Sequence, residues 1–145
     1  ERLEYIIADA EIDIARNQPG RAVQKLSEQV ELSPGNHPLT MTYANALMKN
    51  RQPHIAEEVL IEQSRIRSND PGLWYLLAEV QGLSGHIVGL HQSRAEYFIL
   101  NGNLSQAEKQ LNYALKLTGN DYLANAKITQ RLRDIGVMRE QMEKM

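Results

Sequence analysis

The chain has 145 residues, no cysteine and a formal net charge of −2 at neutral pH. This length suits one domain that buries about 68–70% of its unfolded surface. The near balance of charge excludes a basic field that would recruit nucleic acid or acidic lipid. The lack of cysteine excludes disulfides and thiol chemistry but leaves the compartment open. No apolar run of about 18 residues is present to cross a bilayer. Because the sequence starts at Glu1 and not at Met, we expect it to be a trimmed piece of a longer protein.

Helix boundaries are marked along the chain by proline and capping residues. Asp70 is a good N-cap, and Pro34 lies just past an expected helix end. Prolines stand at four expected helix starts, where a missing N–H is tolerated: Pro19, Pro38, Pro53 and Pro71. The pattern predicts eight helices, over residues 2–16, 19–32, 38–50, 53–68, 71–83, 87–101, 104–117 and 121–143.

Small residues recur at a fixed interval of 34 residues. Ala10, Ala44 and Ala78 are spaced in this way, and so are Ala22 and Ala56. Leu26 and Leu60 follow the same register, and the segment Trp74–Ala78 places bulky residues ahead of a small one. A small side chain is needed where two helices cross closely. We therefore expect all five alanines to be buried at helix crossings.

This register resembles the tetratricopeptide repeat, a helical hairpin whose period is 34 residues. The resemblance covers residues 3–118 and implies an all-α fold, an antiparallel helical-hairpin solenoid of about eight helices with a right-handed superhelical twist. One domain over 1–145 is predicted, with repeats at about 3–36, 37–70, 71–87 and 88–121. A capping helix over 121–143 closes the array, since an open solenoid end must be covered.

The register breaks after Ala56, because Ala107 follows it by 51 residues, one and a half repeats. The helix over 87–101 is therefore predicted to close one repeat and open the next. Arg94 on this helix is directed towards interhelical space in either register. One hypothesis is that Arg94 pairs with Glu79 or Glu108 and fixes the junction, and the alternative is a solvated arginine.

The last helix presents an apolar stripe that suits a cap: Ala124, Ile128, Leu132 and Ile135. Beyond Gly136 the sequence is charged and is expected to fray. The charges from Arg131 to Lys144 are interpreted as the solvated face of an end helix.

A narrower resemblance rests on the segments His91–Tyr97, Leu100–Leu104, Ala107–Leu111 and Asn120–Tyr122. These segments are similar to the C-terminal repeat region of bacterial periplasmic zinc metalloproteases. The resemblance implies a periplasmic location and a protease domain with an HExxH motif, followed by a repeat domain that docks on the outer-membrane β-barrel assembly machinery or on unfolded outer-membrane protein substrates. This sequence contains no HExxH, so the family's catalytic residues map to no position here, and zinc is expected only in a protease domain outside it.

The resemblance to tetratricopeptide repeats also implies a concave groove, lined mainly by the first helix of each repeat, that binds protein. The predicted groove is amphipathic, and its methionines can adapt to varied ligands. The predicted protein-binding residues are Met41, Asn45, Met48, Lys49, Tyr75, Glu79, Gln92 and Glu96, and the same count also places Ile7, Glu11, Ile14 and Ile99 on this face. The residues at the corresponding positions do not match the carboxylate clamp of chaperone-binding repeats, because Met41 stands where that clamp has lysine.

Catalytic and metal chemistry are weakly supported. His86 and His91, five residues apart, lie about 140° apart around a helix and cannot share one face. No nucleophile turn or Gly-rich phosphate loop is present. The packing interpretation is preferred for Trp74 and for four other aromatic residues: Tyr43, Tyr97, Phe98 and Tyr113.

The resemblance therefore implies the protein-interaction domain of a periplasmic zinc metalloprotease that acts in outer-membrane protein quality control. The alternative is a repeat scaffold that stands alone or is fused to another domain, and a cytoplasmic location stays open with it. An enzyme in its own right requires a closed polar pocket with clustered titratable groups.

Overall fold

The computed structural model describes residues 2–145, and eight α-helices and no strand occupy this range. The helices are α1 (Arg2–Ala15), α2 (Pro19–Leu32), α3 (His37–Lys49), α4 (Pro53–Ser64), α5 (Pro71–Ser84), α6 (Ile87–Leu100), α7 (Leu104–Lys116) and α8 (Tyr122–Glu143). The all-α prediction is confirmed. Seven of the eight predicted helices agree with these bounds to within one residue at each end.

The exception is α4, which ends at Ser64 and not at the predicted residue 68. Its last turn tightens, because the backbone N–H of Ile66 donates to the carbonyl of Gln63, three residues earlier, at 3.1 Å. The chain then passes through a turn before Asp70 opens α5. The apolar periodicity of the sequence gave no sign of this early end.

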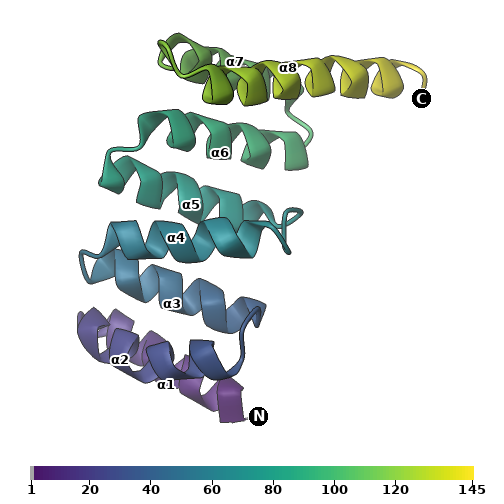
Figure 1. Cartoon of the computed structure of the whole chain (residues 1–145). Helices are drawn as coiled ribbons and strands as arrows, with labels where there is room; N and C mark the ends of the chain where they lie inside the picture. The colour runs from purple at the N-terminus through teal and green to yellow at the C-terminus, as the bar shows by residue number, and fades with distance from the viewer. Residues whose placement is uncertain (1) are drawn as a thin grey trace. The chain divides into compact units, whose positions relative to one another are not determined.

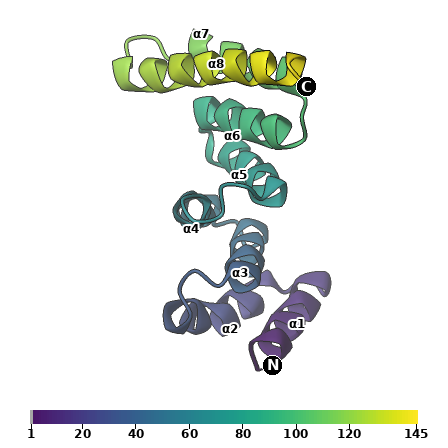
Figure 2. The ribbon, with the colours of Figure 1, turned by 90° about the vertical axis from the view of Figure 1, so that its right-hand side faces the viewer.

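The helices form two compact units, one ending at Ser68 and the other beginning at Asn69. Within the first unit, α1 to α4 follow one another as helical hairpins, and α5 to α8 do the same within the second (Figure 1). In the second unit α7 and α8 lie side by side, as Figure 2 also shows. The predicted superhelical twist and repeat limits stay predictions.

Polar side chains cap four helix starts. Asn36, Asp70, Asn103 and Asp121 each accept a hydrogen bond from a backbone N–H in the first turn, at 2.9–3.2 Å. Such caps satisfy amide donors that have no partner within the helix. Because Asn36 caps α3, that helix begins at His37, one residue before the predicted start.

The five alanines of the register are all buried. Ala10, Ala22, Ala44 and Ala56 are 0% exposed, and Ala78 is 5% exposed. Their predicted burial is confirmed. In the first unit Ala10 and Ala22 pack with Leu26 and Leu39 in one apolar cluster. The methyl side chain lets the helix backbones approach closely, which a larger residue would prevent.

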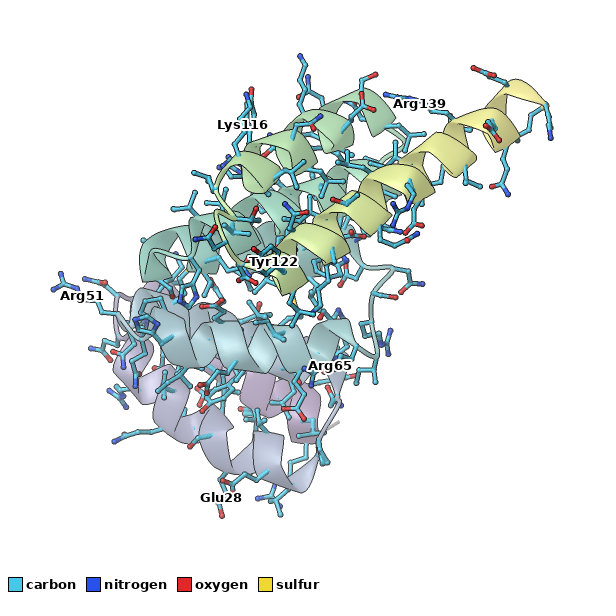
Figure 3. All side chains as sticks on the ribbon, turned by 45° about the horizontal axis from the view of Figure 1, so that its top comes forward. Glu28, Arg51, Arg65, Lys116, Tyr122 and Arg139 are labelled. Carbon is cyan, nitrogen blue, oxygen red and sulfur yellow. The ribbon has the colours of Figure 1, made fainter. Side chains whose placement is uncertain are left out.

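The stripe on α8 forms part of the second unit's core. Ile128 and Ile135, two turns apart, are fully buried and pack in one cluster with Ala95, Ala107 and Leu111. The predicted fraying beyond Gly136 is wrong, because α8 continues to Glu143. Arg139, labelled in Figure 3, donates to Oε2 of Glu108 on α7 at 2.9 Å, which ties the later part of α8 to its neighbour.

Candidate protein-binding surface

The predicted groove residues fall on helices of both units. Four lie on α3 of the first unit, and four lie on α5 and α6 of the second. Lys49, Tyr75 and Glu79 are exposed, and the remaining five are partly buried: Met41, Asn45, Met48, Gln92 and Glu96. The role of this set in binding stays a prediction.

In the second unit, α5 and α6 line an open cavity of about 300 Å³. Its lining combines aromatic, small and charged side chains: Tyr75, Ala78, Glu79, Arg94, Tyr97 and Phe98. Two of these, Tyr75 and Glu79, belong to the predicted set. Gln92 and Glu96 do not line the cavity, although they lie on the same helix as Arg94, Tyr97 and Phe98.

Three rings form the aromatic wall of the cavity. The ring centroids of Tyr75 and Tyr97 are 5.4 Å apart with a tilt of 54°, and those of Tyr97 and Phe98 are 5.6 Å apart at 69°. The pair of Tyr97 and Phe98 meets edge to face, and both centroid distances lie in the favourable range of about 4.5–7 Å. Tyr75 is 62% exposed, so one end of this aromatic chain remains open to solvent. Tyr97 and Phe98 were predicted only as packing residues.

Arg94 does not bridge the helices as the first sequence hypothesis proposed. It is exposed and lines the cavity with Glu79, and within residues 2–145 it takes part in no ion pair. Glu108, the other predicted partner, pairs with Arg139 of α8. Arginine keeps its charge in proteins, so a cation without an acid partner lies on this lining.

A buried polar contact sets the distance between α5 and α6. The hydroxyl of Ser93 donates to Oε1 of Gln81 at 2.6 Å, and both residues are buried. Gly89 makes room for that amide, since a Cβ at this position would lie 2.7 Å from Nε2 of Gln81. The hydrogen bond thus joins the two helices that line the cavity, and Gly89 leaves the space that it needs.

The other side of α6 is fixed by α8. Nε and Nη2 of Arg131 both donate to the carboxylate of Glu96, each at 2.8 Å, and Nη1 reaches Asp134 at 3.0 Å. The hydrogen bonds to Glu96 raise the pKa of Arg131 above its usual value. The interpretation of the charges from Arg131 onward as simply solvated is therefore wrong for Arg131 and Arg139. Glu96, predicted for the groove, is engaged by α8.

The first unit has a larger and more apolar cavity, of about 500 Å³, near the ends of α2 and α4. Its lining includes Val30, Thr40, Val59 and Ile66, and none of its residues belongs to the predicted groove set. Nearby, Nε2 of Gln63 lies 2.9 Å from Nδ1 of His37. The Arg65 side chain at its edge is labelled in Figure 3.

Within residues 2–145 no three His, Cys, Asp or Glu side chains come together in a way that could hold a metal ion. The α5–α6 cavity holds one carboxylate, from Glu79, and one guanidinium, from Arg94. In the same range no helix combines the length and apolarity needed to cross a membrane. The lining of the α5–α6 cavity combines ring surfaces with one charge of each sign.

Part of the chain matches a known repeat family. Residues 13–80 match the family model described as tetratricopeptide repeat, which confirms the resemblance inferred from the 34-residue register. Among solved structures, the NMR structure of the first TPR domain of the human RPAP3 protein aligns with 98% of this chain and 95% of its own, at 15% identity and a TM-score of 0.44.

Curated relatives named "Beta-barrel assembly-enhancing protease" align along most of the chain. The Yersinia pestis protein is 28% identical over 134 residues, which cover 92% of this chain and 28% of that protein. The Escherichia coli K12 protein is 25% identical over 139 residues, which cover 96% of this chain and 28% of that protein. The chain thus spans little more than a quarter of the length of these relatives.

Proposed function

We propose that this chain, whose residues 13–80 match the tetratricopeptide repeat model, is the protein-interaction region of a periplasmic zinc metalloprotease. In this proposal the protease acts in outer-membrane β-barrel protein assembly and quality control. The observation that carries it is the alignment with the assembly-enhancing proteases over 92% of this chain, well beyond the repeat match alone.

The repeats supply a binding surface, not the catalytic centre. Repeat proteins of this kind bind partners through extended surfaces built from successive hairpins. The sequence contains no HExxH, and residues 2–145 offer no cluster of metal ligands, so the side chains present do not fit a zinc site. The proteolytic step and its zinc belong, on this proposal, to a domain outside the 145 residues.

The proposed partners are components of the outer-membrane assembly machinery or unfolded outer-membrane proteins. Binding is assigned to the predicted groove residues, with Tyr75 and Glu79 of the α5–α6 cavity as its best-defined part. Aromatic and arginine side chains are the residues most enriched among strong interface contacts, and this cavity has both.

Site-specific photo-crosslinking in Gram-negative cells tests the proposal. A photoreactive residue replacing Tyr75 should capture an outer-membrane assembly component or an unassembled outer-membrane protein. The same residue replacing Lys109, an exposed position on α7, is the matched control and should capture much less. Substitution of Tyr75 by alanine should weaken capture by a photoreactive residue placed at Glu79, on the same helix, without lowering the midpoint of thermal unfolding.

Two outcomes would contradict the proposal. If the full-length protein that contains this chain fractionates with the cytoplasm, the periplasmic assignment fails. If capture from Tyr75 yields only proteins unrelated to the outer membrane, the chain is a repeat scaffold of another system, the alternative that the sequence left open.

A further inference from the structure

We propose that the α5–α6 cavity binds an internal, extended peptide segment in which one aromatic side chain is flanked by an acidic and a basic residue. This inference rests on the proposed function, because it specifies the kind of polypeptide that the interaction region takes. It is carried by the combination of rings, space and unpaired charge around one cavity.

The cavity selects a single large side chain. At about 300 Å³ it is at the lower end of the range for ligand pockets, about 300–1,000 Å³. Ala78 contributes only a methyl group to the lining, and Tyr75, Tyr97 and Phe98 contribute ring surfaces. An inserted aromatic ring would extend the tilted series that these three rings already form.

The two charged groups on the lining favour an occupant that carries both signs. Arg94 presents a guanidinium without an acid partner in the described chain, and this group binds a carboxylate with two parallel hydrogen bonds. Glu79, also exposed, presents a carboxylate that favours a cation. A purely acidic ligand would meet repulsion from Glu79, and a purely basic one would meet it from Arg94.

The requirement for both charges defines the spacing in the peptide. In an extended chain, side chains at alternate positions point to the same side. The acid and the base should therefore lie two residues before and two residues after the aromatic residue, so that all three face the cavity. A free C-terminus would supply the carboxylate alone and leave Glu79 without a counter-charge.

The receptor side is already ordered. The Ser93–Gln81 hydrogen bond holds α6 against α5, and the Arg131–Glu96 pair holds it against α8. Because α5 and α6 are already held together, binding does not have to order them, and the loss of conformational entropy on binding is smaller.

The experiment measures fluorescence anisotropy of labelled peptides on the intact 145-residue chain. The probe is acetylated and amidated, with aspartate, phenylalanine and lysine at every second position and serine between them, and both orders of the charges are made. Replacing phenylalanine by alanine in the better probe should weaken binding about tenfold or more. Tyr97→Ala in the protein should have an effect of similar size.

Double-mutant cycles then assign the charges. Arg94→Gln should weaken binding of the aspartate probe about two- to fivefold, but should leave the asparagine version of the probe nearly unchanged. Glu79→Gln should behave in the same way towards the lysine position. Lys109→Gln removes an exposed charge from α7 and should change neither affinity. Far-UV circular dichroism of every variant checks that the helices are retained.

The inference is overturned if the alanine probe binds as well as the phenylalanine probe, or if Arg94→Gln weakens the aspartate and asparagine probes equally. It is also overturned if a probe with a free C-terminal phenylalanine and no lysine binds more tightly. If the peptides do not bind but photo-crosslinking from position 75 still captures outer-membrane proteins, this inference is wrong and the proposed function stands. If the peptides bind and the double-mutant cycles give the expected couplings, but capture from Tyr75 yields only proteins unrelated to the outer membrane, this inference stands and the proposed function is wrong.

Discussion

The alanine register is the residue-scale feature that can be tested most directly. Ala44 is fully buried and belongs to the series with Ala10 and Ala78. A leucine at this position would force extra methylene groups into a closely packed crossing, which destabilises by roughly 1–3 kcal/mol. We expect Ala44→Leu to lower the free energy of unfolding by this amount in urea titration.

The control for this prediction is Ala8→Leu, which makes the same chemical change at an exposed position of α1 in the same unit. Its effect should stay within about 0.5 kcal/mol. If the two variants unfold alike, the alanine register does not mark close crossings.

Two glycines within helices make a second matched pair. A Cβ at Gly89 would lie 2.7 Å from Nε2 of the buried Gln81, but a Cβ at Gly136 would meet nothing within 4 Å. Alanine normally stabilises a helix interior over glycine by roughly 0.5–1 kcal/mol. Gly136→Ala should therefore raise the unfolding free energy, and Gly89→Ala should lower it, because the Gln81 amide must move and lose its bond to Ser93.

Calorimetric unfolding of both variants gives the comparison. A gain at both positions would mean that Gln81 adjusts without loss, and that the contact does not fix the separation of α5 and α6.

At the scale of elements, α8 is held by ion pairs between residues that lie far apart in the sequence. Arg131 and Glu96 are 35 residues apart and share two hydrogen bonds in a half-buried position. We expect Arg131→Gln to increase amide hydrogen exchange along α8 about tenfold, since removal of one partner leaves the other carboxylate poorly compensated. Exchange is measured on resolved amides of α8.

Arg133→Gln is the matched control. Arg133 lies on the same helix, is exposed, and bonds only to the nearby Gln130 in the described structure. Its exchange profile should resemble that of the parent chain. Equal acceleration in both variants would show that the pair with Glu96 has no special part in holding α8.

These ion pairs are the part of the fold that could not be predicted from the sequence. Helix bounds and buried alanines depend on local signals, such as caps, prolines and a repeat period, so they could be predicted. The partners of Glu96 and Glu108 depend on where α8 packs, which no local pattern encodes. One hypothesis therefore paired Arg94 with Glu79 or Glu108, but Glu108 pairs with Arg139. The charges from Arg131 onward were interpreted as solvated, but Arg131 pairs with Glu96.

The candidate site was predicted in part for the same reason. Repeat register places Tyr75 and Glu79 on one face of their helix, and both line the α5–α6 cavity. Tyr97 and Phe98 looked like core residues because aromatic side chains at helical spacing usually pack inside. Only the positions of two helices together reveal that their rings line an opening.

At the scale of the whole molecule, the chain divides at Ser68 and Asn69 into units with separate apolar clusters. We expect residues 69–145 to remain helical when expressed alone, because Ile128, Ile135 and Leu111 bury their side chains within this unit. The slope of unfolding free energy against urea should be roughly half that of the intact chain, since it scales with exposed surface. Circular dichroism during urea titration measures both. A fragment without helical signal would mean that this unit's own core is insufficient.

The position of Trp74 on α5 gives the molecule a natural optical label. It is the one tryptophan in the sequence, and it lies beyond the division, in the unit that also has the α5–α6 cavity. Intrinsic fluorescence excited at the red edge of the absorption band therefore reports on one half of the chain, and the dichroic signal averages over both. Divergence of the two traces during denaturation would reveal sequential melting without any engineered dye. The same emission offers a label-free readout of ligands that reach the neighbouring Tyr75.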